Sequence, residues 1–172
     1  ALGFNIIYLC PIFEEDDSED RAFWSNRQKK SETNNPKNPY RIGDYFRIDG
    51  EYGTEEDLRE FMTEAYRLGL EVWFDLVYMH CGPGKFGKAH PDFLKRDGEG
   101  NILCSKYHFP YLDFANPALC EYLWGNMLYW VEQFDVDGYR CDVGDKVPLD
   151  FWREGKRRIE AIKPNFCMVN EG

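Results

Sequence analysis

The sequence lacks the patterns that identify several common functions. None of its apolar runs approaches the ~20 consecutive residues that a helix needs to cross a bilayer. Its first strand-like run continues as PIFEEDD, without the G-x-G-x-x-G or G-x-x-x-x-G-K-S/T loop that would hold a phosphate. A membrane span, a Rossmann-type dinucleotide site and a P-loop nucleotide site are therefore excluded.

Positive charge is also scarce. The chain has 21 Lys and Arg against 31 Asp and Glu, which gives a formal net charge of −10. Its basic clusters, RQKK at residues 27–30 and KRR at 156–158, are short and typical of solvent-exposed faces. Nucleic acids and anionic membranes are bound by clustered Lys and Arg, so neither is an expected partner. A neutral polar ligand fits this composition better.

No two of the six cysteines form a C-x-x-C pair, which disfavours zinc ribbons and thioredoxin-like redox sites. Cys10, Cys141 and Cys167 lie in or beside apolar, strand-like runs, where a free cysteine usually behaves as a small hydrophobic residue. The dispersed cysteines favour a reducing compartment, and hence a cytoplasmic location.

Short apolar runs alternate with amphipathic segments along the chain. With 172 residues, 43% of them hydrophobic, the sequence is long enough for one domain with a sizeable core. The patterns predict strands at residues 4–10, 71–79, 136–143 and 166–170, and helices at 54–69, 117–134 and 149–162. This alternation indicates parallel βα units, in either a doubly wound sheet or a (β/α)8 barrel.

Charged residues gather where these predicted strands end. Asp75 and His80 lie around the end of one strand, Arg140 and Asp142 at the next, and Glu171 after the last. In both candidate architectures the carboxyl ends of the strands carry the functional site.

Asp142 and Glu171 follow successive predicted strands. Adjacent strands lie about 4.8 Å apart, so the two carboxylates can approach the ~5–5.5 Å separation of a retaining glycosidase pair. Arg140, on the same face as Asp142, would keep that carboxylate ionised as the nucleophile. Glu171 has no equally close cation along the sequence and would keep a raised pKa as the acid. A structural ion pair is the alternative role for Arg140 and Asp142.

These residues resemble the α-amylase family of glycoside hydrolases, family 13. DGYRCDV resembles the family's strand-four motif, MVNEG the end of strand five and DLVYMH the strand-three motif. NPYRIGDYFRIDGEYGTEEDL and FPYLDFANPAL resemble the segments after strand two and before helix three. The resemblance implies Asp142 as nucleophile, Glu171 as acid/base, Arg140, His80 and Tyr40 as substrate-binding residues, and Asp75 as a structural residue beside Arg140.

The implied fold is part of a (β/α)8 barrel, roughly units two to five, with a short domain-B-like excursion at residues 81–116. The implied function is retaining hydrolysis of α-glucosidic linkages in starch-like or malto-oligosaccharides. A transglycosylase, isomerase or phosphorylase of the same family would use the same carboxylates. A non-catalytic barrel that binds sugar or scaffolds a protein is an alternative from another class.

The sequence also departs from the family pattern. Met79 stands where many members have a calcium-binding Asn, and a thioether suits Ca²⁺ poorly, so neither calcium nor another cofactor is predicted. Asp145 and Lys146 replace the Lys-His that often follows the nucleophile. The acidic run at residues 14–20 is predicted to be a solvated loop.

Four of the family's eight units are matched, without the third catalytic Asp that follows strand seven. The chain is therefore predicted to be an internal fragment of a longer protein, whose missing barrel strands leave open sheet edges. In isolation it is expected to be inactive and prone to aggregation.

Overall fold

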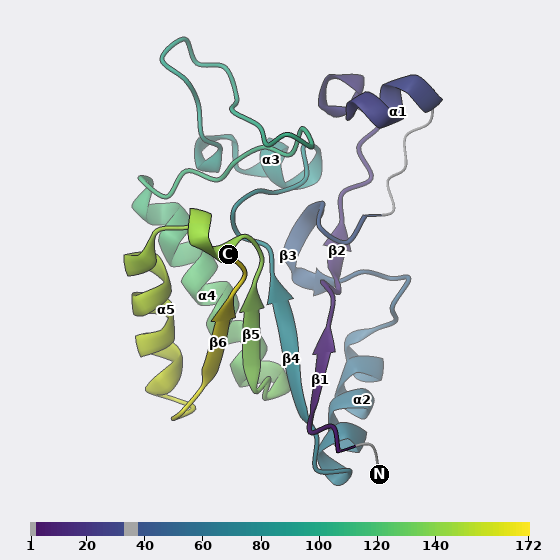
Figure 1. Cartoon of the computed structure of the whole chain (residues 1–172), viewed down its shortest axis with the longest axis vertical. Helices are drawn as coiled ribbons and strands as arrows, with labels where there is room; N and C mark the ends of the chain where they lie inside the picture. Colours follow the sequence, from purple (N-terminus) through teal and green to yellow (C-terminus); the bar gives the residue numbers. More distant parts are fainter. Residues whose placement is uncertain (1–2, 33–37) are drawn as a thin grey trace.

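The computed structural model describes residues 3–32 and 38–172, which form a four-stranded parallel sheet and a separate pair of strands. The order in the larger sheet is β1-β4-β5-β6 (Figure 1). These strands span Ile6–Leu9, Glu71–Leu76, Gly138–Cys141 and Cys167–Asn170. All four lie within the strands predicted from the sequence.

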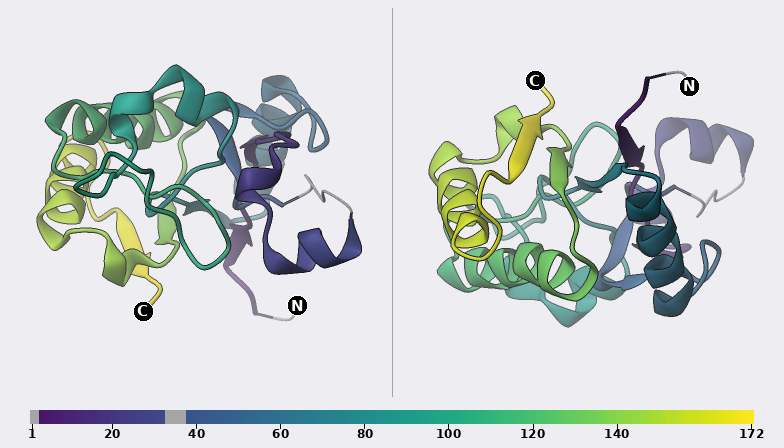
Figure 2. Two further views of the ribbon diagram at one scale, coloured as in Figure 1. Left: turned by 90° about the horizontal axis from the view of Figure 1, so that it is seen from above. Right: turned by 90° about the horizontal axis from the view of Figure 1, so that it is seen from below.

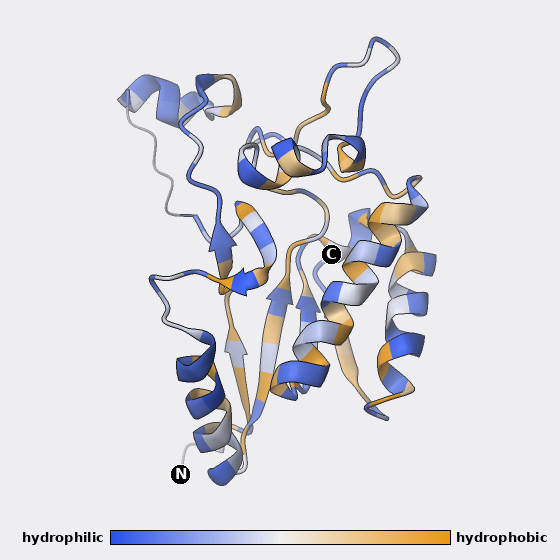
Figure 3. Ribbon diagram, turned by 180° about the vertical axis from the view of Figure 1, so that it is seen from behind, coloured by the Kyte–Doolittle hydropathy of each residue, from blue (hydrophilic) through white to orange (hydrophobic). Residues whose placement is uncertain are grey.

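Three long helices cover one side of this curved sheet (Figure 2). They are α2 (Glu55–Arg67), α4 (Pro117–Phe134) and α5 (Leu149–Glu160), each within or equal to a predicted helix. A capping box between Thr54 and Asp57 begins α2, and Asn116 accepts a hydrogen bond from the Ala118 N–H at the start of α4. Both α2 and α5 turn mainly hydrophilic residues to solvent (Figure 3).

The core lies between the sheet and these helices. Phe74 on β4 contacts the ring of Trp130 on α4, and both side chains are almost fully buried. Asn126, also fully buried, bridges the core by accepting from the Tyr78 hydroxyl and donating to the Tyr45 carbonyl. This packing holds β4 and β5 in a fixed position, and these strands carry the predicted site residues Asp75 and Arg140.

An antiparallel pair of strands was not predicted. It joins β2 (Phe13–Glu15) to β3 (Ile42–Ile48), with irregular register. The chain between them carries a 3₁₀ turn, η1 (Arg21–Phe23), and a short helix, α1 (Asn26–Ser31). The alternating burial of β3 is weak, so this strand depends on pairing with a partner that is distant in sequence.

The prediction of a solvated loop at residues 14–20 is wrong for Asp16, which is fully buried. Its carboxylate accepts hydrogen bonds from the backbone N–H groups of Ser18, Gly84 and Lys85. Gly82 and Gly84 leave room for it, since a Cβ at either position would overlap the Asp16 side chain. The loop is therefore tied to the segment after β4 by contacts that local sequence does not reveal.

Residues 81–116 rise above the carboxyl ends of the strands (Figure 1). The segment contains α3 (Lys85–Ala89), η2 (Pro91–Phe93) and isolated antiparallel bridges, among them Arg96 with Ile102 and Cys104 with Pro110. Its description as a reduced second domain stays a prediction. Within the described ranges, no helix is long and apolar enough to cross a membrane.

The outer strands β1 and β6 are less buried than β4 and β5. Cys141 on β5 is buried, as predicted, but Cys10 and Cys167 are exposed, because Cys10 directly follows the outer strand β1 and Cys167 lies in the outer strand β6. Phe4, Tyr8 and Val169 are also exposed large side chains. Exposed strand edges support self-association of the isolated chain, which stays a prediction.

Candidate active site

Strand register assembles the predicted site. In the parallel pair β4 and β5, Asp75 lies beside Arg140, and Arg140 in turn lies beside Val169 of β6. The ladder continues past the strand ends, since Asp142 N–H donates to the Leu76 carbonyl and Glu171 N–H to the Cys141 carbonyl. Parallel strands end at one edge of a sheet, so the polar side chains of three strands meet there.

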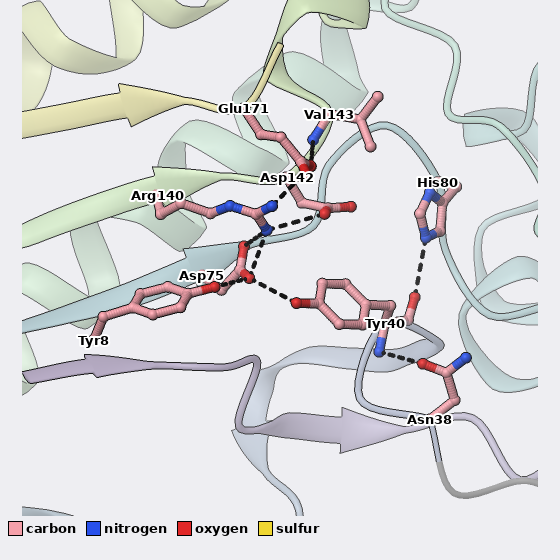
Figure 4. Close-up of polar contacts among 9 residues, drawn as sticks. All are labelled: Tyr8, Asn38, Tyr40, Asp75, His80, Arg140, Asp142, Val143 and Glu171. Carbon is pink, nitrogen blue, oxygen red and sulfur yellow. Dashed lines mark hydrogen bonds and ion pairs between the residues drawn. The ribbon is translucent and has the colours of Figure 1, made fainter.

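Arg140 joins three carboxylates (Figure 4). Its Nη1 lies 2.7 Å from Asp75 Oδ2 and 3.0 Å from Asp142 Oδ1, and its Nη2 lies 2.7 Å from Glu171 Oε2. The guanidinium offers several donors in a fixed plane, so one side chain can hold all three acceptors. The Val143 N–H donates a further hydrogen bond to Glu171 Oε2 at 3.0 Å.

Asp75 anchors this network from below. It is fully buried and accepts hydrogen bonds from the hydroxyls of Tyr8 and Tyr40 as well as from Arg140. Partial burial, together with the hydrogen bonds to Asp75 and its charge, raises the pKa of Tyr40 to about 12 and also raises the pKa of Tyr8. Sequence reasoning missed Tyr8. Its role depends on its position on β1, the strand that pairs with the strand carrying Asp75.

The predicted electrostatic reason for assigning the two catalytic roles is wrong. Burial, with the nearby charge of Asp75, raises the pKa of Asp142 to about 6, and Arg140 only partly offsets this. Glu171 instead has a lowered pKa, because the Val143 N–H and Arg140 stabilise its charged form. The prediction considered only cations close to Glu171 in sequence. It therefore missed that Arg140, on the neighbouring strand, pairs with the half-exposed Glu171.

His80 lies next to Tyr40, whose hydroxyl is hydrogen-bonded to Asp75. The His80 Nε2 lies 3.1 Å from the Tyr40 carbonyl oxygen, and the imidazole packs on Phe109 with ring centroids 4.9 Å apart. Burial lowers the pKa of His80 to about 4, so the ring is neutral at pH 7. A neutral ring that donates to the carbonyl from Nε2 presents Nδ1 as an acceptor, and Nδ1 has no partner in the described structure.

A cleft of about 1820 Å³ opens above these side chains. Tyr40, His80, Arg140, Asp142 and Glu171 all line it, whereas Asp75 lies beneath them. One wall comes from the segment around α1 and another from residues 105–115. The structure thus brings every predicted site residue to one place. No group of three or more His, Cys, Asp or Glu among the described residues is placed to hold a metal ion.

The chain belongs to the alpha-amylase family, because the model of the alpha amylase catalytic domain matches residues 1–97. It is 29% identical to a cyclomaltodextrinase of Geobacillus thermopakistaniensis and 31% identical to a maltogenic alpha-amylase of Bacillus acidopullulyticus. Each match covers 99% of this chain and 29% of the relative, so the chain spans less than a third of their length.

Solved structures show the same relationship. The chain superimposes on an alpha-amylase from Lactobacillus plantarum with a TM-score of 0.83 and 32% sequence identity, covering 98% of this chain and 37% of that one. A maltogenic alpha-amylase, AmyB, from Thermotoga neapolitana gives a TM-score of 0.81 at 33% identity, covering 99% and 38%. The parallel sheet with helices on one side is accordingly part of a (β/α)8 barrel.

Proposed function

We propose that this chain supplies the catalytic nucleophile and acid/base of a retaining glycoside hydrolase that cleaves α-glucosidic linkages in starch-like or malto-oligosaccharides. In this proposal it provides about strands two to five of a complete (β/α)8 barrel. The observation that carries it is Arg140 holding Asp142 and Glu171 together at neighbouring strand ends, beneath an open cleft. Glycoside hydrolysis requires two carboxylates at one cleft, and the closeness of this pair, both contacting one guanidinium, favours the retaining course.

The reaction proceeds in two displacements. Asp142 attacks the anomeric carbon and forms a glycosyl ester, while Glu171 gives its proton to the departing glycosidic oxygen. Glu171, now ionised, takes a proton from water, and the hydroxide equivalent displaces Asp142 from the same carbon. Both displacements invert that carbon, so the product keeps the α configuration.

The other site residues prepare this chemistry. Arg140, fixed by the buried carboxylate of Asp75, orients Asp142 and favours its ionised form. The Tyr40 ring stacks on the reacting sugar, and His80 binds a sugar hydroxyl. Glu171 must leave Arg140 and the Val143 N–H before it can hold a proton, so a sugar entering between them would raise its pKa.

Names of relatives support an α-glucan as substrate. A matched alpha-amylase from Geobacillus thermoleovorans was solved complexed with acarbose, at 26% identity and a TM-score of 0.74. A hydrolase from Arthrobacter globiformis was solved with cyclic maltosyl-maltose, at 25% identity and a TM-score of 0.78. An intracellular maltogenic amylase of Bacillus subtilis, 28% identical, supports the reducing compartment that the cysteines favour.

The test is incubation of the full-length protein with cyclomaltodextrin, maltoheptaose and an α-1,6-linked oligosaccharide. We expect new reducing ends, released as the α anomer when followed by NMR within the first minutes. Products longer than the substrate would assign transfer to a sugar instead of hydrolysis. Release of the β anomer, or no cleavage of any α-glucan, would contradict the proposal.

A further inference from the structure

A tight turn at residues 105–109 forms part of one wall of the cleft. The buried Ser105 hydroxyl accepts hydrogen bonds from the N–H groups of Tyr107 and Phe109, each at 3.2 Å. The Ser105 N–H also donates to the Phe109 carbonyl at 2.8 Å, and the His108 N–H to the Ser105 carbonyl at 2.9 Å. His108 has a φ of 66°, a left-handed conformation that is uncommon for a non-glycine residue and typical of tight turns. The turn therefore holds Tyr107 in a defined position.

Tyr107 presents its ring to the cleft instead of to the core. The side chain is 56% exposed and lines the same cleft as Asp142 and Glu171. The hydroxyl of Tyr52, another exposed tyrosine, lies 3.4 Å from Glu15, but Tyr52 lies outside the cleft lining. Exposure alone is ordinary for tyrosine, so its place in the cleft is the informative feature.

A row of rings connects Tyr107 with the reaction centre. The ring centroids of Tyr107 and Phe109 are 6.3 Å apart, and those of Phe109 and His80 are 4.9 Å apart. Lys106, which also lines the cleft, places its ammonium 4.9 Å from the Tyr107 ring centroid. The row runs from a buried site residue to a solvent-exposed ring, and Lys106 adds a hydrogen-bond donor at its outer end.

We propose that Tyr107 is a stacking platform for a glucose unit that lies away from the bond being cleaved. A pyranose ring has an apolar C–H face that packs against an aromatic ring, while its hydroxyls remain in contact with water or with Lys106. The cleft lining runs from Asp142 and Glu171 to Lys106 and Tyr107, which leaves a continuous path for a chain of several sugars. This inference rests on the proposed function and extends it: the preferred substrate is a glucan longer than a trisaccharide.

The experiment compares Tyr107→Ala and Tyr107→Phe in the full-length protein, with Tyr52→Ala as the matched control. The kcat/KM is measured for maltotriose and for maltoheptaose. Loss of the ring should lower kcat/KM for maltoheptaose by about two- to tenfold and leave maltotriose within about twofold. Phenylalanine keeps the ring, so Tyr107→Phe should behave like the unmodified protein, as should Tyr52→Ala. Equal losses on both substrates, or none on maltoheptaose, would overturn the inference.

Binding without turnover separates this inference from the hydrolase proposal. Electrophoretic migration through a gel containing soluble starch should be retarded for the unmodified protein and for Tyr52→Ala, and less so for Tyr107→Ala. Retardation that depends on Tyr107, in a protein that cleaves no glucan, would sustain the platform and refute the hydrolase. Cleavage with retardation unchanged in Tyr107→Ala would do the opposite.

Discussion

The parallel sheet carries a cluster of charges at each end, and the two clusters differ in kind. At the carboxyl ends of the strands, Arg140 contacts Asp75, Asp142 and Glu171. At the amino ends, Lys163 contacts Asp135 at 2.7 Å and Asp137 at 2.8 Å. Both clusters join elements that are far apart in sequence.

The Lys163 cluster ties together the ends of neighbouring elements. Lys163 also donates to the carbonyls of Val136 and of Asp135, the left-handed residue where α4 ends, and Asp137 accepts from the Val72 N–H. These contacts fix the end of α4 and the start of β5, as cations near helix C-termini commonly do.

The Arg140 cluster differs in its titration and in its opening to the cleft. Three carboxylates compete for one guanidinium, the pKa values of Asp142 and Glu171 shift in opposite directions, and a cleft opens above them. An ion-pair cluster therefore identifies a functional site only when perturbed titration and an opening to solvent accompany it.

The largest expected effect comes from neutralising one aspartate in each cluster. Asp142→Asn should lower kcat by about a thousandfold or more, because the nucleophile is lost. Asp137→Asn should keep the activity and lower the free energy of unfolding by about 1 kcal/mol, because the ion pair with Lys163 is lost. Initial rates on maltoheptaose and thermal unfolding at pH 7 measure both.

Stability should move the other way in Asp142→Asn. Its raised folded pKa means that ionising Asp142 costs stability as pH rises from its ordinary pKa near 4 to about 6. An uncharged Asn avoids this cost, so we expect the variant to be about 1 kcal/mol more stable at pH 7. A less stable variant, or one that keeps a substantial share of the activity, would show that Asp142 is a structural ion-pair residue.

Removing each cation is the next largest test. Arg140→Gln leaves the fully buried Asp75 without its cation, so the free energy of unfolding should fall by about 3 kcal/mol and activity should be lost. Lys163→Gln removes a partly exposed cation and should cost about 1 kcal/mol with activity retained. Urea denaturation together with rate measurements compares the two. Equal losses of unfolding free energy in the two variants would contradict the distinction between the clusters.

The pH profile sharpens the same comparison with a smaller effect. Asp142 and Glu171 influence each other and titrate as a pair, with the pKa of Asp142 at about 6 and that of Glu171 lowered. Below about pH 6 the pair holds one proton, mainly on Asp142, and hydrolysis uses the minor arrangement in which that proton is on Glu171 and Asp142 is ionised. We expect kcat/KM to fall as the pH rises above about 6, because the pair then loses its proton. A plateau that persists to pH 8 would contradict this pairing.

The smallest expected effect is that of removing metal ions. Met79 lines the cleft where a calcium ligand would stand in many relatives, and its thioether binds Ca²⁺ poorly. The midpoint of thermal unfolding should therefore be the same with excess EDTA as with millimolar calcium, since an ion bound to the folded chain would raise it. A midpoint that rises with calcium concentration would show that other ligands replace the Asn.

Sequence reasoning predicted much of this arrangement. The runs that become β1, β4, β5 and β6 and the stripes of α2, α4 and α5 are local signals, because burial repeats with the period of each element. The rule that parallel strands end at one edge then placed Arg140, Asp142 and Glu171 together. The pairing of β2 with β3 and the burial of Asp16 were not predicted, because both depend on partners distant in the sequence.

The sequence by itself determined which residues are available at the strand ends, since residue type and strand period require no knowledge of neighbours in space. Only the tertiary structure decided how their charges are shared. Arg140 on β5 reaches Glu171 at the end of the adjacent strand β6, Tyr8 joins Asp75 from β1, and burial raises the pKa of Asp142. A pKa depends on desolvation and on charges within a few ångströms, and those distances exist only once the strands have paired.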